Sequence, residues 1–213
     1  MSGSALRWHL VRIASSPPAQ LAVSLAEAKR QVRVEDDFFD DDLVLDSCIR
    51  AAIDELDGPD SWLGRALVSQ SYRLTLDRFP MPERGRADAR IRLPLPPIVA
   101  VAALDYIDGA GVSRTLVEGE DYDVFALADS AGFVAPCYGM AWPATRPAPD
   151  AVTVTYSAGW GAPADIPEPL RRWLLMRAGD YYAHREHVIV GGSVQQIDFA
   201  ALSIMRYRRV VIP

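Results

Sequence analysis

Two short acidic runs are the first candidates for chemistry in this sequence. Residues 35–37 read Glu-Asp-Asp and residues 40–42 read Asp-Asp-Asp, with two phenylalanines between them. Carboxylate oxygens bind calcium and magnesium, but these runs lack the alternating Asp or Asn residues and the central glycine of a calcium loop. Acidic residues are also favourable at the positive N-terminal end of a helix. We therefore interpret the runs as helix-terminal charge and expect no metal.

A pair of histidines offers a second possibility, a zinc site. His184 and His187 flank Arg185 and Glu186. In metalloprotease helices the two histidines lie four residues apart, so that they share a face with a glutamate that activates water. Here the spacing is three, the glutamate is adjacent to one histidine, and glycines follow. Zinc chemistry is not expected.

Serine and cysteine nucleophiles are equally poorly supported. Ser157 lacks the flanking glycines of a nucleophile elbow, and His9 is the one remaining histidine that could serve as a base. Cys48 and Cys137 are far apart in the sequence and are interpreted as two buried thiols, with a single disulfide as the alternative. The sequence predicts neither an enzyme nor a cofactor.

The composition and net charge of the chain limit the kinds of partner that it is expected to bind. The chain has 213 residues, of which 50% are hydrophobic, and its net charge is −6. No run of about 18 apolar residues is present, so no membrane partner is expected. The acidic balance also argues against tight DNA binding, because a nucleic-acid binder needs a basic surface to offset phosphate charge.

The elements that position these residues begin with two predicted helices. Ser24 and Glu27 form the pattern of a capping box at the start of a helix over residues 25–34. A second helix follows the acidic runs, with apolar residues at three- and four-residue spacing, and Gly58-Pro59 ends it. The stripe comprises Leu45, Ile49, Ala52, Ile53 and Leu56.

The middle of the chain changes to the two-residue period of strands, beginning with alternating apolar residues over 72–77. Asp108-Gly109 and Gly111 predict a hairpin turn. This pattern favours an antiparallel sandwich or barrel. The further predicted strands cover residues 91–93, 98–106, 114–117, 122–125, 132–135 and 152–156.

A third helix follows Pro167 and Pro169, and it carries an apolar stripe from Leu170 to Tyr181. After Gly191-Gly192 the chain continues as a tail of alternating apolar and basic residues. The sequence thus predicts an α+β fold, a small helical bundle with an inserted antiparallel β-rich domain. The predicted divisions are 1–68 (bundle), 69–160 (inserted β-rich domain), 161–192 (bundle helix) and 193–213 (tail).

Several stretches, taken in order, resemble the head–tail connector (adaptor) proteins of tailed phages and gene transfer agents. They cover nearly the whole chain, and their order carries more weight than any one of them. The stretches are 24–29 (SLAEAK), 64–67 (GRAL) with Gln70 and Tyr72, 91–98 (IRLPLPPI), 142–146 (WPATR), 151–156 (AVTVTY), 158–161 (AGWG), 166–170 (IPEPL), Tyr181-Tyr182, Arg185-Glu186 and 191–193 (GGS).

The resemblance implies a ring subunit, expected in twelve copies, under the portal vertex of a DNA-filled head. Its implied partners are the portal protein, neighbouring copies of itself and a stopper or tail-terminator protein, with genomic DNA as transient cargo. The resemblance also implies that the chain is made in the cytoplasm of a bacterial host and ends up in the neck of the particle. By position, the tail docks on the portal through Phe199, Leu202, Met205, Arg206, Tyr207, Arg208, Arg209, Val210 and Ile212.

An acidic ring also suits a DNA channel, because carboxylates repel phosphate. The predicted channel-lining residues are Asp36, Asp37, Asp40, Asp41 and Asp42. Two alternatives remain open. One is a head-closure (stopper) or tail-completion neck protein, although those are smaller and β-dominated; the other is a small hydrolase that depends on His184 or His187.

Overall fold

The computed structural model describes residues 8–12, 20–81, 89–126, 132–146 and 148–184, together with Ile204 and Tyr207. The chain divides into two compact units. A sheet unit combines Met1–Pro17 with Ser69–Gly159, and a helical unit combines Pro18–Val68 with Trp160–Pro213. The predicted α+β fold, helices from both ends of the chain with antiparallel sheets inserted between them, is confirmed.

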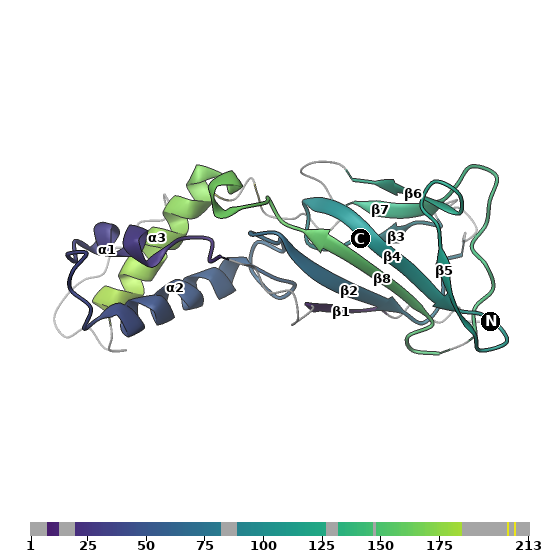
Figure 1. The fold of residues 1–213 in the computed structure, drawn as a ribbon, viewed down its shortest axis with the longest axis horizontal. Coiled ribbons are helices and arrows are strands. Elements are labelled where there is room, and N and C mark those ends of the chain that lie inside the picture. The colour runs from purple at the N-terminus through teal and green to yellow at the C-terminus, as the bar shows by residue number, and fades with distance from the viewer. Residues whose placement is uncertain are drawn as a thin grey trace. The chain divides into compact units, whose positions relative to one another are not determined.

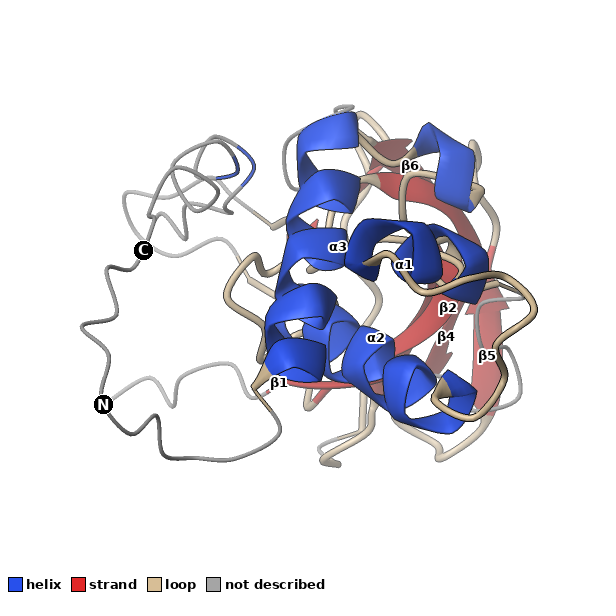
Figure 2. Cartoon of the chain, turned by 90° about the vertical axis from the view of Figure 1, so that its left-hand side faces the viewer, coloured by secondary structure: helices blue, strands red, loops and turns tan. Residues whose placement is uncertain are grey.

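Within the described residues of the helical unit, helices α1 (Leu25–Val32), α2 (Asp42–Leu56) and α3 (Glu168–Ala183) pack against one another (Figure 2). A short 3-10 turn, Pro163–Asp165, precedes α3. The predicted capping box is confirmed: the Glu27 backbone N–H donates to Ser24 Oγ at 3.3 Å, and the Ser24 backbone N–H donates to the Glu27 carboxylate at 2.8 Å. These bonds satisfy amides that the first helical turn leaves without a partner.

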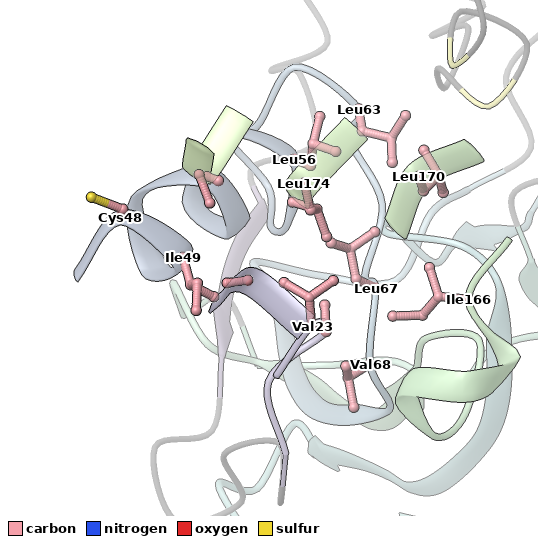
Figure 3. Close-up of a cluster of buried hydrophobic side chains, with 14 of the residues drawn as sticks. Val23, Cys48, Ile49, Leu56, Leu63, Leu67, Val68, Ile166, Leu170 and Leu174 are labelled. Carbon is pink, nitrogen blue, oxygen red and sulfur yellow. The ribbon is translucent and has the colours of Figure 1, made fainter. Parts of the chain in front are cut away.

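The apolar stripes of the helices form one core (Figure 3). From α2 come Leu45, Cys48, Ile49, Ala52 and Leu56, at the three- and four-residue spacing that places side chains on one helix face. From α3 come Leu170, Leu174 and Ala178. Leu67 and Val68, just before the inserted unit, and Ile166, just after it, join the same cluster. Both ends of the chain are therefore needed to complete the core.

The sheet unit consists of two antiparallel sheets within the described residues. Five strands pair in the order β1-β2-β8-β4-β5, and three pair in the order β3-β7-β6. Strands β2, β8 and β4 lie side by side in Figure 1. The strand bounds are β1 Trp8–Arg12, β2 Gln70–Leu76, β3 Ile91–Arg92, β4 Ile98–Ile107, β5 Ser113–Leu116, β6 Tyr122–Phe125, β7 Phe133–Pro136 and β8 Val152–Ala158.

Strands β2 and β8 alternate strictly between buried and half-buried or exposed residues, as their sequences predict. Strand β4 does not, because its register against β8 shifts between Ile98 and Ala100 and again between Val101 and Ala103. Each such irregularity moves the following side chains to the other face of the strand.

Strand β1 departs from the prediction that residues 1–68 all belong to the helical bundle. It pairs with β2 at the edge of the larger sheet, with His9 opposite Thr75. The reason is an unused strand edge on β2, which a distant segment of the chain can pair with. No helix among the described residues is long and apolar enough to cross a membrane.

Candidate functional site: acidic loop and C-terminal segment

The acidic loop between α1 and α2 is organised by one buried lysine, which the sequence did not single out for this role. Lys29 is 4% exposed and belongs to α1. Its ammonium donates to the backbone oxygens of Asp36 and Phe38, at 3.3 and 2.7 Å, and pairs with the Asp42 carboxylate at 2.7 Å. A buried charge requires partners of this kind. Lys29 therefore fixes both the middle of the loop and its junction with α2.

The five aspartates predicted to line a channel fall into two groups. Asp36, Asp37 and Asp40 are exposed. Asp41 and Asp42 are half-buried or paired: Asp41 accepts a hydrogen bond from the Tyr182 hydroxyl of α3, and the half-buried Asp42 pairs with Lys29. The second group holds the loop in place, whereas the residues of the first group are exposed.

The same loop and the first turn of α2, to which Leu43 belongs, expose large apolar side chains. Phe39 is 69% exposed and Leu43 is 87% exposed, with Phe38 beside them at 44%. The Lys29 ammonium lies 4.9 Å from the centre of the Phe39 ring, a cation–π distance. A loop that offers aromatic rings between carboxylates has the composition of a protein contact surface.

Of the residues predicted to dock on a portal, Tyr207 lies within the described residues, and the other eight lie outside them. Tyr207 is half-buried against the helical core, and its backbone oxygen accepts a hydrogen bond from the guanidinium of Arg65. The tail position Ile204 is buried in the core itself. The two described tail residues thus contact the chain's own helical unit.

Among the residues that the structure describes, the candidates for catalysis do not come together. No cluster of three or more His, Cys, Asp or Glu residues with metal-binding geometry exists among the described residues. His184 is exposed and lies at the end of α3, with Nδ1 3.0 Å from the Asp180 oxygen, and His187 lies outside the described residues. Ser157 is half-buried in β8, where its hydroxyl donates to the Ala100 oxygen at 3.4 Å.

The two cysteines are not joined: Cys48 is buried in the helical unit and Cys137 is half-buried in the sheet unit. Desolvation, together with the carboxylates of Asp123 and Asp121, raises the pKa of the Cys137 thiol. A raised pKa keeps the sulfur protonated at neutral pH, which makes it a poor nucleophile.

A hollow of about 890 Å³ in the sheet unit was not foreseen from the sequence. Phe79 and Trp142 stack in it at 4.7 Å between ring centres, and its wall is mostly proline, alanine and methionine. Its charged residues include Asp77 and Arg78, which pair with each other at 3.3 Å. The alternating pattern of strands gave no signal for this hollow, because loops supply most of its lining.

The elements described above are those of an α+β protein built from a helical unit and an inserted sheet unit. No protein-family model matches the sequence, and no curated protein matches it. Among the solved structures with chains of similar fold are the following three. They are described as the neck of an empty GTA particle computed with C6 symmetry, the virion of a native gene transfer agent (GTA) particle and the neck of a native GTA particle computed with C12 symmetry.

The likeness extends over almost the whole of both chains. The TM-scores are 0.75, 0.74 and 0.68, in that order, and each match has 22% sequence identity and covers 96% of this chain and 97% of the other. At this identity the likeness is one of fold.

Proposed function

We propose that this chain is a structural, non-enzymatic subunit of the neck of a gene transfer agent or related phage-like particle, and more specifically the head–tail connector (adaptor) that docks on the portal. The observation that carries the proposal is the likeness of fold, over nearly the full length, to chains of gene transfer agent necks. One of those necks was computed with C12 symmetry, which suits a ring of twelve copies.

The helical unit favours an adaptor over a stopper or tail-completion protein. Stopper proteins are smaller and β-dominated, whereas here α1, α2 and α3 form a separate core that both chain ends complete. A ring subunit needs two different contact surfaces that close by rotation and does not need an active-site cleft. The exposed apolar side chains of the acidic loop supply a surface of the required kind.

Charge supports passage of DNA through such a ring. The chain carries a net charge of −6, and a ring of copies multiplies it. We assign the channel-facing role to Asp36, Asp37 and Asp40, whose carboxylates are exposed, with Asp41 and Asp42 holding the loop in shape. Carboxylates along a channel repel phosphate, so DNA slides through without binding.

Docking on the portal is assigned to the C-terminal segment. Its apolar residues provide anchors, while Arg206, Arg208 and Arg209 pair with acidic groups of the portal. Each copy contributes a modest contact, and repetition around the ring converts it into durable attachment.

The test is co-purification with the portal protein of the same particle, followed by negative-stain imaging of the complex. The full chain is expected to give a ring stacked on the portal. The chain truncated from Phe199 onward is expected to lose this stacking while it still unfolds cooperatively, which is the control for the loss of the buried Ile204. Undiminished portal binding by the truncated chain would refute the docking role. A second assay measures binding to duplex DNA at physiological salt, where no affinity is expected; a sub-micromolar dissociation constant would overturn the channel assignment.

A further inference from the structure

The smaller sheet of the sheet unit carries a row of basic and aromatic side chains. Its described strands pair in the order β3-β7-β6, so β7 lies between two edge strands (Figure 1). Arg92 of β3 lies opposite Phe133 of β7, and Phe133 lies opposite Phe125 of β6. Residues directly opposite each other in an antiparallel pair lie on the same face of the sheet. The three side chains therefore form one row across this sheet.

This row is open to solvent, and its members contact one another. Arg92 and the neighbouring Arg90 are exposed, and Phe125 is 44% exposed. The Phe125 and Phe133 rings stack at 4.8 Å between centres, and the Arg90 guanidinium carbon lies 4.4 Å from the centre of the Phe133 ring. Aromatic residues and arginine are enriched at protein interfaces. We call Arg90, Arg92, Phe125 and Phe133 the arginine–phenylalanine surface.

The same unit carries two exposed carboxylates on the turn between β5 and β6. Glu118 and Glu120 flank Gly119, whose φ of +82° is one that glycine adopts readily. Two hydrogen bonds close the turn: the Asp121 amide donates to the Val117 oxygen at 2.9 Å, and the Val117 amide donates to the Asp121 carboxylate at 2.8 Å. Val117 is itself 50% exposed. Because the turn is already formed, binding through it costs little conformational entropy.

The β5–β6 turn and the arginine–phenylalanine surface lie at different places in the sheet unit. The turn directly precedes β6, which begins at Tyr122, whereas Phe125 is the last residue of that strand. Arg92 lies on β3, the other edge strand of the smaller sheet. A contact between identical chains that uses two different surfaces is head-to-tail, and it closes into a ring when the rotation between copies permits.

We propose that the β5–β6 turn of one copy docks on the arginine–phenylalanine surface of the next copy in the ring. The proposal rests on the proposed function, which it deepens by naming a contact between copies. Two carboxylates face two guanidiniums, and a guanidinium has five donors with which it binds a carboxylate in addition to groups of its own chain. The exposed Val117 side chain packs on the Phe125 ring, so the contact also removes apolar surface from water.

Reversing the charges of one surface at a time tests this contact. Arg90→Glu with Arg92→Glu makes both surfaces of a copy acidic, and Glu118→Arg with Glu120→Arg makes both basic. Each double variant alone should assemble at least about tenfold more weakly than the native chain, because like charges then face each other. An equimolar mixture of the two should recover native assembly, because the acidic surfaces of one variant then face the basic surfaces of the other. Recovery also shows that both variants are folded.

The matched control is Arg73→Glu with Arg146→Glu. It replaces two exposed arginines outside both surfaces and changes the net charge of the sheet unit by the same amount as the first double variant. Sedimentation velocity over a series of concentrations measures assembly of the chain alone, and negative-stain imaging with the portal protein measures ring formation on the portal.

The contact is supported if both double variants assemble more weakly than the control and their mixture recovers. It is wrong if the native chain forms no assembly in either experiment, if the double variants behave like the control, or if the mixture does not recover. In the last case the two surfaces bind something other than each other. Rings on the portal that are insensitive to the reversals would leave the proposed function standing without this contact. Charge-dependent assembly by a native chain that does not bind the portal would keep the contact and overturn the adaptor role.

Discussion

Replacing Lys29 by methionine is the most informative single change in the helical unit. Methionine preserves the unbranched stem of lysine and so most of its packing, but it removes the charge and all of its hydrogen bonds. The variant leaves the Asp42 carboxylate without its ion-pair partner and removes the donor to the backbone oxygens of Asp36 and Phe38.

The expected loss follows from the burial of the pair. Removing one partner of a buried ion pair typically costs about 3–5 kcal/mol. The Lys29 side chain is 5% exposed, but that of Asp42 is 27% exposed, so water can restore some of the solvation of its carboxylate. We therefore expect a loss of about 2–3 kcal/mol. In a chain of this size that corresponds to a fall of about 4–12 °C in the melting temperature.

Thermal and urea unfolding, followed by circular dichroism at the helical signal, measure the effect. Arg30→Met is the matched control, because Arg30 is the next residue on α1 and is exposed. The double variant Lys29→Met, Asp42→Asn should lose less unfolding free energy than the two single variants lose together, because the ion pair can be broken only once. If Lys29→Met unfolds within about 0.5 kcal/mol of Arg30→Met, the loop is not held by Lys29 and the reasoning fails.

Two further changes test local claims. Burial of Glu27 would raise its pKa, but hydrogen bonds from Ser24 and the Arg171 guanidinium outweigh it and lower the pKa below the ordinary value of 4.5. The stability that Glu27 contributes is then present above about pH 4.5 and is lost as the pH falls through the lowered pKa. Between pH 7 and pH 3 the free energy of unfolding should therefore fall less for Glu27→Gln than for the native chain. Equal falls in the two chains would contradict this. In the sheet unit, a Cβ on Gly132 would lie 2.7 Å from Ile98 Cγ1, so Gly132→Ala should destabilise the protein by about 1–3 kcal/mol in urea unfolding. Gly109→Ala is the control and should not destabilise it, because no atom lies within 4 Å of a Cβ at that position. Equal effects of the two substitutions would contradict the close approach at Gly132.

Most of the fold could be predicted from local patterns in the sequence. The Ser24–Glu27 capping box and the stripe of α2 need only neighbours within one or two helical turns, and both were predicted correctly. Strands β2 and β8 were recognisable because one face of each is buried along its whole length. These features depend on residues close together in the sequence, which is why a pattern reveals them.

Features that depend on distant partners could not be predicted in the same way. Strand β1 pairs with β2 although a long stretch of chain separates them, and nothing in its own five residues specifies that edge. The burial of Lys29 depends on two backbone oxygens, which have no sequence signature. The acidic residues were singled out as a group, but only the fold shows that Asp41 and Asp42 hold the loop while Asp36, Asp37 and Asp40 are exposed.

The sheet unit is inserted at a point where its two connections lie close together within the helical unit. Leu67 and Val68 before it, and Ile166 and Leu170 after it, belong to one core, and the amide of Trp160 donates to the Leu67 oxygen at 2.9 Å. The two ends of the insertion therefore lie close together within the helical unit. Closing such a short gap costs little chain entropy.

Replacing residues 69–159 by a linker of Gly-Ser-Gly should thus leave a folded helical protein. We expect a cooperative thermal transition and a helical circular dichroism spectrum, because the buried residues of α2 and α3 retain their partners. The same excision combined with Ile49→Asp is the control, since a carboxylate in that core should abolish the transition. An excised chain with no helical signal and no cooperative unfolding would mean that the helices depend on the sheet unit for their stability, and the division into two self-sufficient cores would be wrong.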